Sequence, residues 1–356
     1  MGLTRLEVTN FRSFKQANLR PSRGLNVIAG ANASGKTTLL EAIHTLGMGR
    51  SFRSGGSRQM VRYGTDGLIV HGRYCTESGV DIALGVERTL SGRRIKVNGK
   101  SCDGARALAE ILPLQAIVPD TRYLFVHSAQ SRRAIMDWGL FHVEPQFYPL
   151  WLCYRRALHQ RNSALSDGAR ALEAWDHELA SLGEKVHTLR QRYVDSLQPR
   201  VVAQASALLA EEGLELELRP GWASDQPLAH ALIKDRERDQ AHGYTHAGAH
   251  RADLKIRLNG LPLKEGASQG QQKLAIIALR LAQVELVRQQ RGRRCLLLLD
   301  DVSGELDHEH RARLMAVAAA LDAQAFVTIT EPAELNTDVW QDCKMFHVEH
   351  GHVREG

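Results

Sequence analysis

Cysteines and aromatic residues are scarce in this sequence. The five cysteines are Cys75, Cys102, Cys153, Cys295 and Cys343. They are far apart, odd in number and without a C-x-x-C pair, which argues against a disulfide framework or a zinc site and for a reducing compartment. Aromatic residues make up 6% of the chain. This low content does not indicate a surface on which the bases of a single strand would stack.

Long apolar runs are also missing. The longest strictly apolar stretch, Leu314 to Leu321, is far shorter than the roughly 20 residues that cross a bilayer as a helix. The opening residues MGLTRLEVTN contain no apolar signal core. We therefore expect a soluble, cytoplasmic protein without a membrane partner.

Lysine is also rare in this sequence. Ten of the 46 basic residues are lysines, and the others are arginines. An excess of arginine favours contacts with phosphates and planar groups. The formal net charge of +6 is modest, and taken alone it favours a nucleic-acid partner only weakly. With 356 residues the chain is long enough for one large domain with an excursion, or for two lobes.

A complete phosphate-binding motif lies in residues 25–46, LNVIAGANASGKTTLLEAIHTL. Gly30, four further residues and Gly35-Lys36-Thr37 match the Walker A pattern, with an apolar strand before it and an amphipathic helix after it. These flanks decide against the alternative, a glycine-rich turn with a surface lysine. The motif suits a polyphosphate: Lys36 would contact its β- and γ-phosphates, and the Thr37 hydroxyl would ligate Mg²⁺. The predicted nucleotide-binding residues are Gly30, Ala31, Asn32, Ala33, Ser34, Gly35, Lys36, Thr37 and Thr38.

A second anion site is predicted at Ser268, which stands at the N-cap of an amphipathic helix. Gly270 and Gln271 follow it. The positive N-terminus of a helix and a capping hydroxyl together bind anions without a metal. An ordinary capped helix has the same pattern, so the site depends on the motifs around it.

Those motifs include a Walker B strand. Residues 295–299, CLLLL, are entirely apolar and end in Asp300 and Asp301. A central parallel strand would place Asp300 beside the Walker A loop, where it would hold Mg²⁺ together with Thr37. Asp301 would orient the attacking water. Asp301 and Lys36 are therefore the predicted catalytic residues, and Thr37 and Asp300 the predicted Mg²⁺ ligands.

Between these motifs the pattern changes several times along the chain. Residues 47–67 form an irregular segment rich in glycine, serine and arginine, directly after the predicted Walker A helix. Asn98-Gly99 predicts a hairpin turn. Residues 131–209 indicate helices, the longest of about 20 to 25 residues. Strands are expected again at 214–218 and 254–258.

We therefore expect an α/β protein with two lobes. The first lobe is discontinuous, formed by residues 1–130 and 245–356, and contains the phosphate-binding motifs. The second lobe, residues 131–244, is mainly helical.

The order of the motifs resembles that of the ABC-type ATPases: a Walker A loop, Ser-x-Gly-Gln, a Walker B strand and then x-Leu-Asp at 305–307. Further segments resemble the RecF family of bacterial recombination and replication-repair ATPases over essentially the whole chain. They are Asn10 to Phe14, Gly49 to Arg53, Arg132 to Asp137, Gln160 to Asn162, Gly248 to Asp253 and Asp300-Asp301.

This resemblance implies an ABC-type P-loop ATPase head with a mixed sheet and helices, and a mainly helical second lobe. It implies weak DNA-dependent ATPase activity, an ATP-dependent homodimer, and binding to single- and double-stranded DNA at gaps or junctions. RecR- and RecO-type mediator proteins are the implied partners, and DNA replication, recombinational repair and the SOS response the implied processes. In the dimer, Lys36, Thr37 and Asp300 of one subunit would hold Mg-ATP, while Ser268 and Gly270 of the other would cover the γ-phosphate.

The sequence departs from the family pattern at Ala33, Ala249 and Gly304, where glycine, proline and serine are usual. Ala33 matters only if its φ is positive.

Two other functions remain as alternatives. A transporter ATPase subunit is disfavoured by the long separation of Lys36 from Ser268 and by the absence of a switch histidine in residues 326–330. A nucleotide-gated protein scaffold without significant turnover has the same motifs.

Two further patterns have ordinary explanations. His242, His246 and His250 have the spacing of metal ligands on one helix, but glycines interrupt that helix and favour a loop. The three arginines between residues 155 and 161 would contact phosphates or form a solvated helix face, and the sequence alone favours the solvated face.

Overall fold

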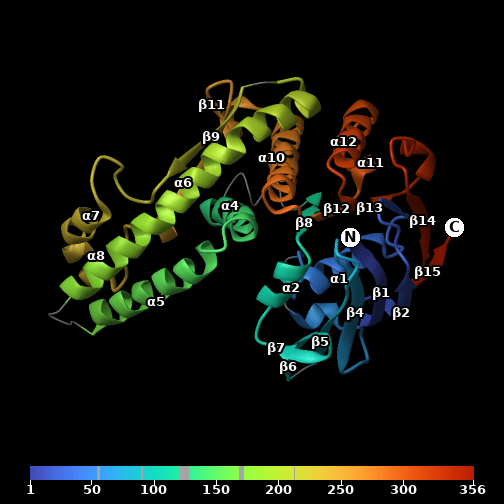
Figure 1. Cartoon of the computed structure of the whole chain (residues 1–356), viewed down its shortest axis with the longest axis horizontal. Coiled ribbons are helices and arrows are strands. Elements are labelled where there is room, and N and C mark those ends of the chain that lie inside the picture. The colour runs from blue at the N-terminus through green and yellow to red at the C-terminus, as the bar shows by residue number, and fades with distance from the viewer. Residues whose placement is uncertain (54–56, 90, 120–127, 168–171, 212) are drawn as a thin grey trace. The chain divides into compact units, whose positions relative to one another are not determined.

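The computed structural model describes residues 1–53, 57–89, 91–119, 128–167, 172–211 and 213–356. Within these residues the chain forms two compact units, whose elements are labelled in Figure 1. The first unit comprises Met1–Arg122, Ala207–Leu209 and Ile276–Gly356, and the second comprises Tyr123–Ser206 and Ala210–Ala275. None of the described helices has an apolar stretch long enough to cross a bilayer.

One sheet of the first unit is antiparallel, with described strands in the order β2-β1-β4-β5-β6-β7. These strands are β1 Gly2–Phe11, β2 Phe14–Leu19, β4 Gly67–Cys75, β5 Asp81–Thr89, β6 Gly92–Val97 and β7 Lys100–Cys102. Buried side chains recur at every second residue of β4, as expected for a sheet with one face in the core. The predicted hairpin is confirmed, because Asn98 and Gly99 both have positive φ between β6 and β7.

The other sheet of the first unit is parallel apart from β15, in the order β15-β14-β3-β13-β12-β8. Its strands are β3 Leu25–Ala29, β8 Leu114–Ile117, β12 Leu296–Leu299, β13 Gln324–Ile329, β14 Cys343–Glu349 and β15 His352–Glu355. Every residue of β3, β12 and β13 is buried, which is typical of strands covered on both faces. Their parallel register brings the C-terminal ends of β3 and β12 to one edge of the sheet.

Helix α1, Lys36–Met48, follows β3 and packs against strands of both sheets (Figure 1). Its Leu39, Leu40, Ile43 and Leu46 are fully buried in a hydrophobic core that also contains side chains from both sheets. Burying such a side chain is worth about 1.5–3 kcal/mol. Because α1 is enclosed, its polar side chains are buried with the apolar ones and need hydrogen-bond partners inside the protein.

The other described elements of the first unit surround these sheets. They are η1 Ser57–Met60, α2 Arg106–Ile111, the end of α10 (Gln269–Arg291), α11 Val302–Glu305, α12 His308–Ala320 and η3 Pro332–Glu334.

The second unit combines helices with a small antiparallel sheet in the order β11-β10-β9. Its elements are α4 Ala129–Val143, α5 Phe147–Ser166, most of α6 (Glu173–Leu209), β9 Leu214–Arg219, α7 Leu228–Lys234, α8 Arg236–His242, η2 Ala249–Arg251, β10 Asp253–Leu258, β11 Leu261–Pro262, α9 Leu263–Gly266 and the start of α10. Residues 245–275 belong to this unit, whereas the sequence assigned them to the first lobe. The physical reason is that β10 pairs with β9 along its whole length.

Helix α6 contains 37 residues, so the expectation of helices of at most about 25 residues is wrong. Pro199 lies inside this helix, where it removes one backbone hydrogen bond. The Arg200 guanidinium donates to the carbonyl of Ser196 at 2.6 Å, and Leu197 and Val201 on either side of the proline are fully buried. Side-chain packing on both sides of the proline allows the helix to continue past a residue that usually ends it.

Segments that resemble the RecF family are joined by ion pairs in the second unit. Arg132 forms a bidentate pair with Asp253 at 2.7 and 2.8 Å. Arg190 forms another with Asp137 at 2.9 and 2.8 Å, and it also donates to the carbonyl of Ala249 at 2.6 Å. These charged residues therefore hold helices α4 and α6 to the chain around β10.

Arg161 is fully buried in the second unit. Its guanidinium donates to Asp176 at 2.6 Å, to Asp239 at 2.7 Å and to Thr245 at 2.8 Å. The expectation of a solvated or phosphate-binding face is therefore wrong for this arginine, although Arg155 and Arg156 are exposed. The helical period explains the difference, because Arg161 lies four residues after the buried Ala157 and so on the same helix face.

The three histidines do not share a helix, which confirms the loop. Helix α8 ends at His242, because Gly243 adopts the left-handed conformation. The nitrogens His242 Nδ1 and His246 Nε2 lie 3.0 Å apart, and His246 Nδ1 lies 2.7 Å from Asp239 Oδ1. Among the residues that the structure describes, no group of three or more histidine, cysteine or acidic side chains is arranged to hold a metal.

Replacing Arg161 with Ala is predicted to destabilise the protein by about 3–5 kcal/mol, because Asp239 would keep a buried charge without its cationic partner. Urea unfolding followed by circular dichroism measures this change. The matched control is Arg156→Ala on the exposed face of the same helix, which should change the free energy of unfolding by less than about 0.5 kcal/mol. Similar losses in both variants would contradict a structural role for the Arg161 ion pairs.

Candidate functional site

The Walker A loop connects the end of β3 to the start of α1, and its backbone explains its residue types. A Cβ atom at Gly30 would lie 2.3 Å from the carbonyl oxygen of Val348, so no side chain fits there. Gly35 has a φ of +117°, which favours glycine. Ala33 has a φ of +63°. This position therefore does require a positive φ, and alanine adopts it at a cost of about 1–2 kcal/mol.

Lys36 lies within the curve of this loop. Its ammonium group donates to the carbonyl of Gly30 at 2.6 Å and to that of Ala31 at 3.0 Å. Burial lowers the pKa of Lys36, and the negative charges of Asp301 and Asp300 oppose this effect. A bound polyphosphate would supply the negative charge that favours the protonated amine.

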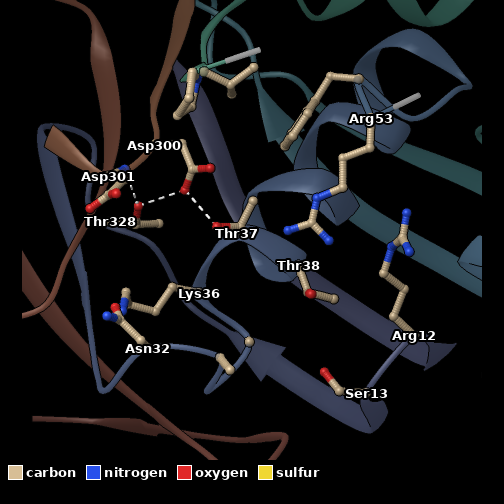
Figure 2. A pocket seen from close by; sticks show the side chains of 15 residues that line it. Arg12, Ser13, Asn32, Lys36, Thr37, Thr38, Arg53, Asp300, Asp301 and Thr328 are labelled. Atoms are coloured by element: carbon tan, nitrogen blue, oxygen red, sulfur yellow. Dashed lines mark hydrogen bonds between the residues drawn. The ribbon is translucent and has the colours of Figure 1, made fainter. Parts of the chain in front are cut away.

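Asp300 follows β12, and two hydroxyl groups converge on one of its oxygens (Figure 2). Thr37 donates to Asp300 Oδ1 at 2.8 Å, and Thr328 from β13 donates to the same atom at 2.7 Å. Burial raises the pKa of Asp300, against the hydrogen bonds from Thr328 and Thr37, which lower it. The parallel order β3-β13-β12 thus places the predicted Mg²⁺ ligands in direct contact.

The Asp300 carboxylate and the Thr37 hydroxyl fit a magnesium ion. Their oxygens are 2.8 Å apart, close to the separation of about 2.9 Å between neighbouring ligands of an octahedral ion with bonds of 2.0–2.1 Å. Mg²⁺ is usually held by one or two protein oxygens together with substrate phosphates, and these two side chains would be those protein ligands.

Asp301 adopts the left-handed conformation with a φ of +52°. Its backbone N–H donates to Thr328 Oγ1 at 2.7 Å. Its carboxylate accepts a hydrogen bond from the Gly304 N–H at 3.3 Å and so caps α11. A Cβ atom at Gly304 would lie 2.5 Å from Asp301 Oδ2, so glycine at residue 304 leaves room for this orientation of the carboxylate.

These groups border a cavity of about 560 Å³ in the first unit. Its lining includes Asn32, Ala33, Gly35, Lys36, Thr37, Thr38, Asp300 and Asp301 from the predicted site, and also Arg12, Ser13, Phe52, Arg53, Val118, Pro119 and Thr328. This volume is within the range of small-molecule sites, about 300–1,000 Å³.

Seven of the lining residues lie outside the predicted site, and three of these bear directly on its chemistry. Arg12 lies in the turn after β1, Arg53 in the segment after α1, and Thr328 within β13. For the arginines a signal was present, because both belong to segments that resemble the RecF family. For Thr328 the sequence offers no such signal, because residues 326–330 are informative there only for the absence of a switch histidine.

The predicted residues around Ser268 belong to the second unit. Ser268 Oγ accepts a hydrogen bond from the Gln271 N–H at 3.2 Å, and Gln271 Oε1 accepts one from the Ser268 N–H at 2.9 Å. This reciprocal pair is a capping box. The predicted N-cap of α10 is thus present, while the role of Ser268, Gly270 and Gln271 in anion binding stays a prediction.

Comparison with known proteins relates the whole chain to one family. Residues 2–354 match the family described as "RecF/RecN/SMC N terminal domain". The "DNA replication and repair protein RecF" of Vibrio atlanticus is 39% identical over 359 residues, covering 100% of both chains. The protein of the same name from Pseudomonas aeruginosa is 40% identical over 362 residues, covering 100% of this chain and 98% of its own.

Solved structures show the same relationship. A structure titled "recombination mediator protein RecF-ATP in RecFOR pathway" has a TM-score of 0.86 and 27% identity, and the match covers 100% of this chain and 97% of that one. An Smc head bound to a ScpA domain has a TM-score of 0.61 at 13% identity, which shows a shared fold. The expected α/β ABC-type ATPase head is therefore confirmed. On its sequence, fold and motif order, the chain belongs to the RecF family.

Proposed function

We propose that the protein is an ATP-dependent DNA-binding protein of DNA replication, recombinational repair and the SOS response. In this proposal ATP drives dimerisation on DNA, hydrolysis is slow, and the dimer assists recombinase loading at gaps. The observation that carries it is the cavity in which the Walker A loop meets Thr37, Asp300 and Asp301. The names of the relatives, DNA replication and repair proteins, support the DNA part of the proposal.

The side chains divide the chemistry among them. The loop N–H groups and Lys36 bind the triphosphate, and Thr37 and Asp300 bind Mg²⁺. When bound, Mg²⁺ supplies positive charge that stabilises the transferring phosphoryl group. Thr328 fixes the orientation of Asp300 through its hydroxyl. Asp301 accepts a proton from the attacking water.

The active site is shared between two copies of the chain in this proposal. The first unit supplies the ATPase lobe, and Ser268, Gly270 and Gln271 of a second copy cover the γ-phosphate. A helix N-terminus with a capping serine suits this role, because its N–H groups and its dipole both favour a phosphate. ATP thereby becomes part of the dimer interface.

Partners follow from the same family. A relative is described as part of the RecFOR pathway, and this supports RecO- and RecR-type partners. The DNA partner in this proposal is single- and double-stranded DNA at gaps or junctions. The matched relatives are replication and repair proteins, which does not favour a transporter subunit. A scaffold without turnover would bind ATP and release no phosphate. Measuring ATP binding and phosphate release therefore distinguishes such a scaffold from the weak DNA-dependent ATPase proposed here, which would act in the cytoplasm.

Replacing Lys36 with Ala removes the charge that contacts the β- and γ-phosphates. ATP affinity, measured by calorimetry, should fall at least about 100-fold, since hydrogen bonds to charged groups contribute about 1.5–3 kcal/mol each. The control is Lys15→Ala at an exposed lysine, which should bind ATP like the wild type. Unchanged affinity in Lys36→Ala would rule out the Walker A assignment.

Mixing two inactive variants tests the shared site. Ser268→Arg lacks the serine that covers the γ-phosphate bound to the other subunit, and Lys36→Ala lacks the lysine of its own Walker A loop. A dimer of one copy of each variant therefore contains one intact composite site. Partial recovery of ATPase activity is expected on mixing, while each variant alone stays inactive. Folded proteins that show no recovery at any ratio would indicate a self-contained monomeric ATPase.

DNA affinity should fall with salt more steeply when ATP is present. Each duplex phosphate neutralised by an arginine or lysine contributes about −0.9 to the slope of log affinity against log salt. A dimer presents more basic residues than a monomer, so the ATP-bound form should have the steeper slope. Fluorescence anisotropy over a salt series measures it, and equal slopes with and without ATP would contradict an ATP-organised DNA surface.

A further inference from the structure

Glu41 is a fully buried carboxylate in the middle of α1. One of its oxygens accepts a hydrogen bond from Arg12 Nη2 at 2.7 Å and one from Ser51 Oγ at 2.6 Å, and the other accepts one from Arg12 Nε at 2.6 Å. Arg53 Nη1 lies 3.5 Å from the second oxygen. One buried negative charge thus contacts two guanidinium groups that come from different parts of the chain.

Both guanidinium groups belong to the nucleotide cavity. Arg12 and Arg53 line it together with the Walker A residues. In Figure 2 they lie on the Thr38 side of the cavity, whereas Asp300 and Asp301 lie on the opposite side. Glu41 follows Thr37 and Thr38 by about one helical turn, is fully buried, and reaches the cavity through the two arginines.

The direction of the Walker A loop indicates which part of a nucleotide would reach these arginines. Lys36 contacts the β- and γ-phosphates, and the loop N–H groups contact the α- and β-phosphates. In the proposed site the γ-phosphate would therefore lie on the side of Asp300. The α-phosphate and the nucleoside would extend past Thr38 toward Arg12 and Arg53.

The segment after α1 is fastened to the same helix. Ser51, which bonds to Glu41, also accepts a hydrogen bond from the Arg53 N–H at 2.8 Å. One turn along α1, His44 Nδ1 donates to the carbonyl of Arg50 at 2.8 Å, and its ring contacts Phe52 edge-to-face at 5.2 Å. Burial lowers the pKa of His44 to about 4, so the ring is neutral at pH 7. Phe52 also lines the cavity.

The backbone presents Arg12 in a constrained way. Its φ is +47°, which is unfavourable for a residue with a side chain. Its N–H donates to the carbonyl of Met60 at 2.8 Å. The turn after β1 therefore holds the Arg12 backbone, and Glu41 holds its guanidinium.

We propose that Glu41 is a positioning residue for nucleotide binding: it holds Arg12 and Arg53 so that their guanidinium groups contact the α-phosphate and the nucleoside of ATP. The proposal rests on the nucleotide site proposed above. Glu41 uses the Nε and Nη2 edge of Arg12, which leaves the Nη1 side for the ligand. Fixing an arginine side chain in advance removes from the binding step the entropy cost of ordering that side chain.

A simpler role for Glu41 predicts the opposite result. If the carboxylate acts only as a negative charge near an anionic ligand, its removal strengthens ATP binding. If it positions the arginines, its removal weakens ATP binding, because two adjacent like charges lose their common anchor and turn away from one another. The direction of the change in affinity therefore separates the two roles.

The experiment is a double-mutant cycle on the full-length protein, with Mg-ATP affinity measured by calorimetry. Glu41→Gln should lower the affinity about tenfold in the wild-type background. In the Arg12→Ala/Arg53→Ala background the same substitution should change it less than twofold, because the residues through which Glu41 acts are gone. In steady-state assays Glu41→Gln should raise KM for ATP with little change in kcat.

Thr45→Val is the control for disturbance of the buried face of α1. The Thr45 hydroxyl donates to the Glu41 carbonyl at 2.8 Å and is buried, but this residue does not line the cavity. It should keep wild-type ATP affinity. Tighter or unchanged ATP binding in Glu41→Gln overturns the proposal. So does an equal loss of ATP affinity when Glu41→Gln is made in the wild type and in Arg12→Ala/Arg53→Ala. Failure of the wild-type protein to bind ATP would instead contradict the proposed function.

Discussion

The site depends on one constraint, the parallel pairing of β3, β13 and β12. This order places the Walker A loop after one strand, Asp300 after another, and Thr328 on the strand between them. The short hydrogen bonds from Thr37 and Thr328 to a single carboxylate oxygen follow from this register. A shift of one residue in β12 would turn Asp300 to the other face of the sheet, so the apolar strand residues determine the position of the charged group.

Enclosure of α1 between two sheets has a second effect on the site. The apolar side chains of α1 supply the core, but a helix buried on nearly all sides also buries Glu41, His44 and Thr45. Each of these groups finds its partner outside the helix or in the preceding turn. The walls of the cavity, Arg12 and the segment after α1, are therefore placed by the same burial that stabilises the fold.

The sequence predicted the parts of the site that are local in the chain. A buried strand followed by a glycine loop and a helix has a strong pattern, and so does an apolar strand that ends in two acids. Contacts between distant segments leave no periodic signal, so the sequence pattern does not distinguish Glu41 from the other polar residues of an amphipathic helix. Arg161 shows the same limit, because its three partners lie between residues 176 and 245. At Pro199, packing around α6 overrides the usual effect of a proline on a helix, and this packing is not visible in the sequence pattern.

The conformation of Asp301 has a consequence for timing. With one carboxylate oxygen capping α11, the Asp301 side chain is held in one orientation. If the proposed reaction with water needs another orientation, Asp301 must first give up the cap. An N-cap contributes about 1 kcal/mol, so leaving it would reduce the reactive population roughly fivefold at equilibrium. Glycine at residue 304 makes this resting orientation possible, and a bulkier residue there would force the carboxylate elsewhere. The interval for which ATP stays intact, and with it the lifetime of an ATP-held assembly, would then be set partly by a residue that never touches the nucleotide.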